Sequence, residues 1–173
     1  MKLFFLITIV IFSISCRPKK PLSSVNKTEI VDSTCPDNGT CTFEILKNKV
    51  LAIKEDEFGK LYPDITDGKA LVLKFQFLRD SIPNTEDSEY REVLLMQLDS
   101  NQSDIELEGS DLQNVKLLFG RLCFCRGQTG YYKIDKGRLS VIKSDSNKYT
   151  LNLDFKCDAV PQILQNLNQS FEY

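Results

Sequence analysis

Cysteine is the residue type with the most varied chemistry in this 173-residue chain. A thiol can form a disulfide, bind a soft metal or exchange electrons with another thiol. Six cysteines are present, and five of them follow residue 34: Cys35, Cys41, Cys123, Cys125 and Cys157. Cys35 and Cys41 flank a stretch of Pro, Asp, Asn and Gly that favours a turn, so we expect these two to pair. Five thiols form at most two bridges and leave one over.

The other three cysteines allow one more disulfide. Cys123 and Cys125 are two residues apart on an expected strand, where their side chains point the same way and lie too far apart for easy mutual pairing. The expected second bridge therefore joins this strand to Cys157, and we place it at Cys125. Alternatively, all three thiols stay reduced as small buried apolar groups.

A sharper alternative is a metal- or thiol-handling protein in which Cys123, Cys125 and Cys157 form a trigonal thiolate site for Cu(I) or Zn(II). The chain contains no histidine and no Cys-x-x-Cys pair, and Phe124 separates two of these thiols. The missing pair and the lack of a βαβ pattern also argue against thioredoxin-like redox chemistry. We therefore expect no bound metal and no cofactor.

The stretch 125–132 is a candidate binding loop. Its two glycines permit positive φ or the close approach of another backbone. Around them, Arg126, Gln128, Thr129 and Tyr131 could present hydrogen-bond donors to a carboxylate, a phosphate or a sugar. The competing interpretation is a tight hairpin connection with exposed polar residues.

Several classes of function are excluded or disfavoured by composition. The absence of histidine rules out Ser-His-Asp and Cys-His catalysis. With 22 basic and 24 acidic residues, the charge is too balanced to indicate nucleic-acid binding. Acidic residues on expected loops and strand ends, such as Glu89 and Glu92, could form a hydrolytic pair, although any chain of this composition supplies such pairs by chance. We expect a protein that is not an enzyme.

The first sixteen residues have the features of an export signal. Lys2 precedes an apolar run, 3–12, which contains a single polar residue and is followed by Ser15 and Cys16. The run is too short for a membrane-spanning helix, which takes about 20 residues, and its length suits the core of a signal peptide.

This segment resembles the signal of bacterial lipoproteins, in which a short apolar core and a small residue precede an obligatory cysteine. The resemblance implies that Cys16 is linked to diacylglycerol and becomes the new N-terminus, with the membrane as a partner through its lipid. The alternative is an ordinary secretory peptide that is cleaved nearby. The Lys-, Asn-, Ile- and Phe-rich composition and the stretch 123–132 also resemble the small envelope lipoproteins of Bacteroidota, which implies an envelope location and no particular activity.

Three segments follow from this interpretation: a signal peptide at 1–15, a lipidated N-terminus and flexible tether at 16–34, and a β-rich globular domain at 35–173. The 18 residues after Cys16 span about 23 Å as a random coil. We expect anchoring in the bacterial cell envelope, at the outer membrane, with the domain in the periplasm or at the cell surface. Disulfides are the default state of cysteines in such a compartment.

Short apolar runs separated by turn residues predict a mainly β domain, either an antiparallel β-sandwich or an open barrel of about 8–10 strands. The clearest strand is 148–157, where apolar and polar residues alternate. The runs 70–79 and 89–98 predict a central strand pair. Other expected features are hairpins at 42–46 with 49–54 and at 131–134 with 138–143, a short strand at 105–107, and a strand at 115–125 with a bulge at Gly120.

The spacing of Val160, Ile163, Leu164 and Leu167 predicts one short C-terminal helix near 159–169. Taken together, the sequence favours a lipid-anchored envelope protein with a non-catalytic binding or structural β-domain. Its partner would be an unidentified envelope protein or a small ligand.

Overall fold

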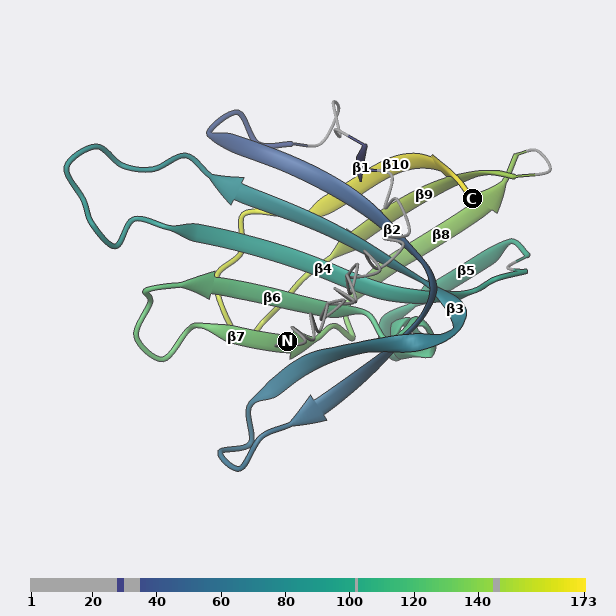
Figure 1. Ribbon diagram of the computed structural model, residues 1–173, viewed down its shortest axis with the longest axis horizontal. Coiled ribbons are helices and arrows are strands. Elements are labelled where there is room, and N and C mark those ends of the chain that lie inside the picture. The colour runs from purple at the N-terminus through teal and green to yellow at the C-terminus, as the bar shows by residue number, and fades with distance from the viewer. Residues whose placement is uncertain (1–27, 30–34, 102, 145–146) are drawn as a thin grey trace, which may run out of the picture.

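The computed structural model describes residues 28–29, 35–101, 103–144 and 147–173 (Figure 1). This part of the chain contains ten strands and one short 3₁₀ helix, and every strand pairing is antiparallel. In chain order they are β1 (Thr28–Glu29), β2 (Gly39–Glu55), β3 (Leu61–Arg79), β4 (Tyr90–Asp99), β5 (Ile105–Glu108), η1 (Gly109–Val115), β6 (Leu118–Cys123), β7 (Gly130–Lys133), β8 (Gly137–Lys143), β9 (Lys148–Phe155) and β10 (Asn166–Glu172). The expected mainly β, antiparallel architecture is confirmed.

The expected signal peptide, Cys16 and most of the tether lie outside the described residues. Within the described ranges, no helix has the length and apolar character needed to cross a membrane.

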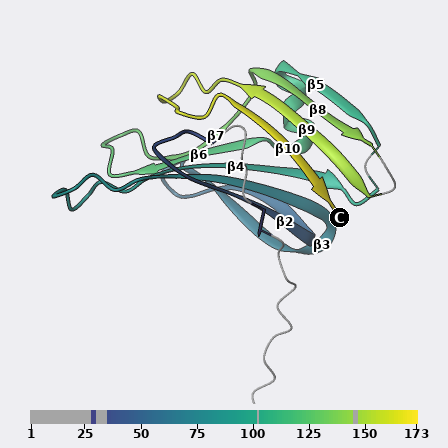
Figure 2. The ribbon, with the colours of Figure 1, turned by 90° about the horizontal axis from the view of Figure 1, so that it is seen from above.

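The strands form two sheets that pack as layers (Figure 2). The first sheet has the order β1-β2-β3-β4-β6-β7, and the second has the order β10-β9-β8-β5. One of the crossings between them, from β5 to β6, runs through η1, whose Leu112 side chain is fully buried. A large apolar cluster lies between the layers, with members from the inner faces of both sheets.

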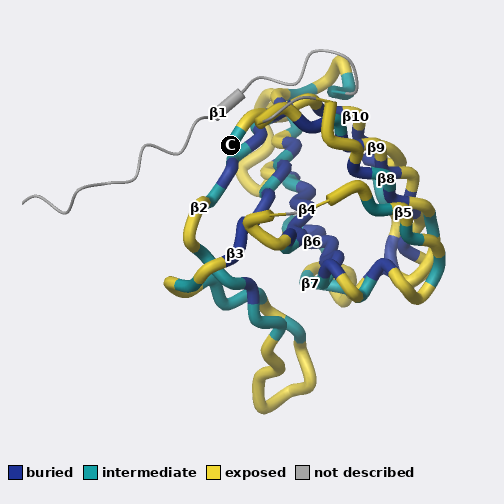
Figure 3. The backbone as a smooth tube through the Cα atoms, turned by 90° about the vertical axis from the view of Figure 1, so that its right-hand side faces the viewer, coloured by how far each residue is buried: buried dark blue, intermediate teal, exposed yellow. Residues whose placement is uncertain are grey.

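The first sheet also closes on itself. The first residue of β3, Leu61, pairs with Tyr131 of β7. The strands β3, β4, β6 and β7 therefore form a closed ring. This closure is possible because β3 is 19 residues long and curves away from the sandwich. A second, smaller apolar cluster fills the interior of the ring: Leu51, Val72, Val93, Leu95 and Leu118. Figure 3 shows the buried backbone in the layers and the exposed tip of the β2–β3 hairpin beyond them.

Two strand predictions are confirmed in detail. In β9, alternate residues are buried and exposed, as the period of two required. The strands β3 and β4 pair over nine residues of β3, from Ala70 to Leu78, and six of these nine are buried because each face of the sheet meets one of the two apolar clusters.

The hairpin expected around Lys47 and Asn48 is wrong, because β2 continues through both residues. Asn48 adopts a left-handed conformation with φ 56°, and the register against β3 shifts between Lys47 and Lys49. Asn tolerates this conformation better than most residues. The position is therefore a bulge that bends the strand without reversing it.

The hairpin expected between 131–134 and 138–143 is also wrong. The strand β7 pairs with β6, whereas β8 pairs with β9 and β5 in the other sheet. The residues between them, 134–136, carry the chain from one layer to the other. A short turn-like sequence cannot distinguish a hairpin from a crossing between sheets.

The expected C-terminal helix is absent from the described residues. Residues 156–165 form an irregular loop, and Leu167 belongs to β10, where it faces Leu153 of β9. The helical spacing was misleading because it joined two buried loop residues, Val160 and Leu164, to a strand whose own period of two places Leu167 and Phe171 in the core.

The expected bulge at Gly120 is absent as well, since the β4–β6 register is regular through this residue. A Cβ atom at Gly120 would lie 2.6 Å from a ring carbon of Tyr131. The glycine therefore makes room for the Tyr131 ring, which crosses the strand at this point.

Candidate functional site

Four loops lie toward the left side of the molecule in Figure 1, spread from the 80–89 loop above to the tip of the β2–β3 hairpin below. The end of β3 pairs with the start of β4, and the start of β4 pairs with the end of β6. The end of β6 in turn pairs with the start of β7. The Leu61–Tyr131 pair brings in the tip of the β2–β3 hairpin. We call the loops 56–60, 80–89, 124–129 and 156–165 together the loop end.

Exposed large apolar side chains concentrate at the loop end. Six such side chains occur in the described residues, and five lie on these loops or beside them: Phe58, Tyr62, Leu78, Ile82 and Phe124. The exposed fractions of Phe58 and Phe124 reach 78% and 83%. The sixth, Ile142, lies on β8 near the other end of the molecule. Exposed aromatic residues on several loops along one side of a molecule are typical of an interaction surface.

The same loops carry an excess of negative charge. They contain seven acidic and three basic residues, a formal charge of −4, compared with −2 for the whole chain. Most of this charge lies on the β3–β4 loop, which holds Asp80, Glu86, Asp87 and Glu89 and no basic residue. The loop end therefore combines apolar tips with an acidic surround.

A buried polar cluster holds the base of the loop end. The Glu92 side chain on β4 has no exposed surface, and its two oxygens accept hydrogen bonds from the backbone N–H groups of Ile163 and Leu164, each at 2.7 Å. The hydroxyl of Tyr90 donates to the same carboxylate. Burial and the hydrogen bond to Glu92 raise the pKa of Tyr90 to about 12. This carboxylate therefore attaches the 156–165 loop to the first sheet.

Arg121 extends the cluster toward the 124–129 loop. Its Nη1 donates to the backbone oxygen of Gln128 at 3.1 Å and to the side-chain oxygen of the same residue at 3.2 Å. The hydroxyl of Thr129 donates to the Arg121 backbone oxygen. The guanidinium groups of Arg79 and Arg121 both lie over the Tyr90 ring, with centroid distances of 4.8 and 5.3 Å.

The structure assigns different roles to the four residues of the predicted binding loop. Gln128 and Thr129 hold the loop to Arg121 rather than standing free for a ligand. Arg126 is exposed at the tip. Tyr131 packs against the smaller apolar cluster on the other face of the sheet, where burial raises its pKa. The four residues therefore do not form one ligand site.

The disulfides differ from the expected pattern at one bridge. Cys35 pairs with Cys41 as the sequence predicted, whereas Cys123 pairs with Cys125 and leaves Cys157 as a buried thiol. Adjacent pairing is possible because the regular strand ends at Cys123, which brings the two Cα atoms to 5.2 Å, within the normal range.

The two bridges also differ in what they contribute to stability. Closing the seven-residue loop 35–41 contributes about 2 kcal/mol in the chain-entropy model, and the three-residue loop 123–125 contributes about 1.5 kcal/mol. With Cys123 and Cys125 bonded, the three-thiolate site is not assembled in this form. No group of three metal-ligating side chains occurs in the part of the chain that the structure describes.

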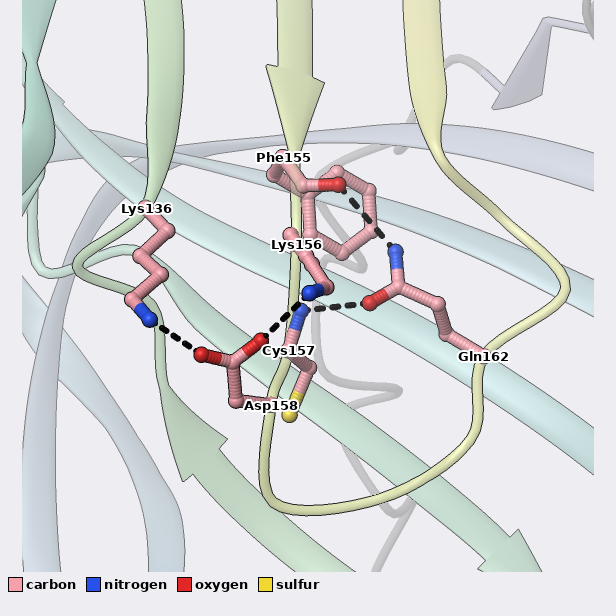
Figure 4. Close-up of polar contacts among 6 residues, drawn as sticks. All are labelled: Lys136, Phe155, Lys156, Cys157, Asp158 and Gln162. Carbon is pink, nitrogen blue, oxygen red and sulfur yellow. Dashed lines mark hydrogen bonds and ion pairs between the residues drawn. The ribbon is translucent and has the colours of Figure 1, made fainter.

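A hollow of about 620 Å³ lies along the 156–165 loop and is lined by residues 155–162 and by Gln165. Figure 4 shows how this loop is held: the Gln162 side chain accepts from the Cys157 N–H and donates to the Phe155 oxygen. Asp158 pairs with both Lys136 and Lys156 at the rim. Sequence reasoning missed this arrangement, because its glutamine-to-backbone bonds leave no sequence pattern.

The Asp158 ion pairs predict an acid-sensitive loop. The hydrogen bond from Lys136, reinforced by that from Lys156, lowers the Asp158 pKa from 3.8 to about 2. Because the folded state favours the ionised form, the stabilisation is complete above pH 3.8 and is lost as the pH falls toward 2. We expect amide exchange in residues 156–165 to accelerate across this range. The Asp158→Asn variant should show no such acid step, and an identical step in both proteins would contradict the assignment.

Glu92 does not lie on a loop or at a strand end, where its position in the sequence had suggested a surface carboxylate. It shares the inner face of β4 with Tyr90, Leu94 and Met96, and the period-2 pattern of the strand contained that information. A carboxylate on an otherwise apolar face indicates a buried hydrogen-bonded group.

Comparison with protein-family models, with curated proteins and with solved structures finds no match. The functional assignment therefore rests on the geometry of the loop end.

Proposed function

We propose that this chain is a lipid-anchored protein of the bacterial cell envelope whose β-domain binds a protein partner through the loop end. The lipid anchor rests on the lipoprotein-like signal and on Cys16. The binding role rests on one observation: five of the six exposed large apolar side chains in the described residues lie on or beside loops that also carry a formal charge of −4.

The acidic loops favour a protein over a lipid surface. Anionic lipid headgroups attract basic segments and repel acidic ones, so loops with this charge are poorly suited to rest on a bacterial membrane. A protein with an apolar pocket and a basic rim would complement both features of the loop end.

The loops are held rigidly enough at their bases to serve as a binding surface. Glu92 holds the 156–165 loop, and Arg121 holds the 124–129 loop. In the 80–89 loop, the Ser88 backbone oxygen accepts from Arg79, and the Ser88 hydroxyl oxygen accepts from the backbone N–H of Ile82. Loops that are ordered before binding lose less conformational entropy on association, which favours affinity.

A displayed library of random peptides tests this function with the full chain. We expect selection of peptides that combine aromatic and basic residues, with binding that weakens as salt is raised. Replacing Phe58 and Phe124 together with serine should lower affinity for the selected peptides at least about tenfold, because exposed aromatic residues commonly dominate such interfaces.

Ile142→Ser provides the matched control, because it removes an exposed apolar side chain from the other end of the molecule. Selected peptides that bind the double variant as tightly as the original protein would refute the proposal. Selection of acidic peptides would refute the charge argument, and preferential binding to anionic vesicles would indicate a membrane surface instead.

A further inference from the structure

The two disulfides lie in different environments. In the first, Cys41 is buried in the main apolar cluster, and Cys35 is half-buried and packs against that cluster. In the second, Cys123 and Cys125 are both half-buried and belong to a surface loop. The bridge 35–41 therefore has one cysteine inside the core, whereas neither cysteine of the bridge 123–125 is fully buried and this bridge can meet molecules from solution.

The surroundings of the second bridge form an accessible apolar recess. A hollow of about 400 Å³ is lined by Cys123, Phe124, Cys125, Arg126, Gly127 and Thr129. Cys123 also borders a second hollow of about 370 Å³ beside the 80–89 loop. Phe124, between the two cysteines, is the most exposed large apolar side chain in the described residues, at 83%.

Positive charge lies on both sides of the bridge in the sequence. Arg121 precedes Cys123 by two residues on the same face of β6, and Arg126 directly follows Cys125. Nearby cations stabilise a thiolate and make it a better leaving group in disulfide exchange. Cys123 packs against the apolar core, whereas Cys125 is not part of that cluster, so Cys125 is the sulfur open to attack.

We propose that the Cys123–Cys125 bridge is a thiol–disulfide exchange centre that accepts electrons from the dithiol of a partner protein. A partner thiolate attacks the Cys125 sulfur, and the bond to Cys123 breaks, which releases a Cys123 thiolate that takes up a proton. The second partner thiol then attacks the mixed disulfide and frees Cys125 as a thiol. The bridge gains two electrons and two protons, and the partner dithiol becomes a disulfide.

Phe124 gives this exchange its preference for a protein over a small thiol. Its ring stands in solvent between the reacting cysteines, where an apolar groove beside a partner's dithiol can cover it. The activity does not depend on the partner binding proposed above, because the exchange can be measured with a small dithiol alone.

The test uses the full oxidised chain, with dithiothreitol or a thioredoxin-type dithiol protein as reductant, followed by acid quenching, alkylation and peptide mapping. We expect Cys123 and Cys125 to be alkylated at least about a hundredfold faster than Cys35 and Cys41, with the circular dichroism of the β-sheets unchanged. Hydroxyethyl disulfide should then restore the bridge. Equal rates for the two bridges, or reduction only together with loss of the β signal, would overturn the proposal.

Three variants sharpen the result. A thioredoxin-type probe with its second cysteine replaced by serine should be trapped on Cys125, and trapping on Cys123 would overturn the assigned direction of attack. Cys157→Ser should leave the rates unchanged, and loss of exchange would transfer the activity to the buried thiol. Phe124→Ser should slow the protein probe at least about tenfold more than it slows dithiothreitol, and equal slowing would overturn the docking role of the ring.

Discussion

Replacing Glu92 with leucine should lower the free energy of unfolding by about 3–5 kcal/mol, because the change leaves buried polar groups without their partner. The carboxylate accepts from the Ile163 and Leu164 N–H groups and from the Tyr90 hydroxyl, and its side chain has no exposed surface. Denaturant unfolding monitored by circular dichroism measures the loss. Amide exchange at Ile163 and Leu164 should accelerate more than in the strands.

Glu89→Leu is the matched control for this variant. Glu89 precedes β4 by one residue, has a side chain that is 71% exposed, and forms a long ion pair with Arg91 at 3.6 Å. Surface changes of this kind usually alter stability by less than about 0.5 kcal/mol. A loss below 1 kcal/mol in Glu92→Leu, or equal losses in the two variants, would contradict the role assigned to the buried carboxylate.

Replacing Cys16 with serine should transfer the protein from the membrane to the soluble fraction almost completely. A diacylglycerol on Cys16 supplies two acyl chains, which give stable anchoring where one chain gives only reversible binding. Detergent phase partition and incorporation of labelled fatty acid, both in a bacterial host that processes lipoproteins, measure the change. This prediction rests on the sequence alone, since Cys16 lies outside the described residues.

Cys35→Ser is the control for Cys16→Ser, because it removes a different cysteine and leaves the signal intact. It should keep both the label and the membrane location, although it loses the bridge to Cys41. Two results would refute the lipid anchor and favour an ordinary secreted chain. One is fatty-acid label that remains on Cys16→Ser, and the other is an original protein that is unlabelled and fully soluble.

Local sequence patterns were sufficient to predict those elements whose structure does not depend on a particular distant partner. The alternation in β9 and the apolar runs of β3 and β4 predicted strands, and the turn-rich segment between Cys35 and Cys41 predicted their bridge. In each case the structure is encoded by a few consecutive residues or by the alternation of side chains along a strand. Burial of the apolar side chains in the clusters favours the same structure.

Local patterns failed where the outcome depends on which distant segment lies opposite. The hydrogen-bond partner, not the local sequence, decided that Asn48 is a bulge and that β7 and β8 belong to different sheets. The apolar spacing in 160–167 suited a helix, but Glu92 and Gln162 satisfy the loop backbone instead and leave Leu167 to pair with β9.

By itself, the sequence therefore determined the β class, the strands with a clear period of two, and the 35–41 bridge, because these depend on side-chain alternation and short loop closure. Only the tertiary structure decided the closed ring of the first sheet, the adjacent bridge at Cys123 and Cys125, and the placement of apolar, acidic loops along one side of the molecule. These features join residues that are far apart in the chain or depend on where a strand stops, and long-range packing controls both.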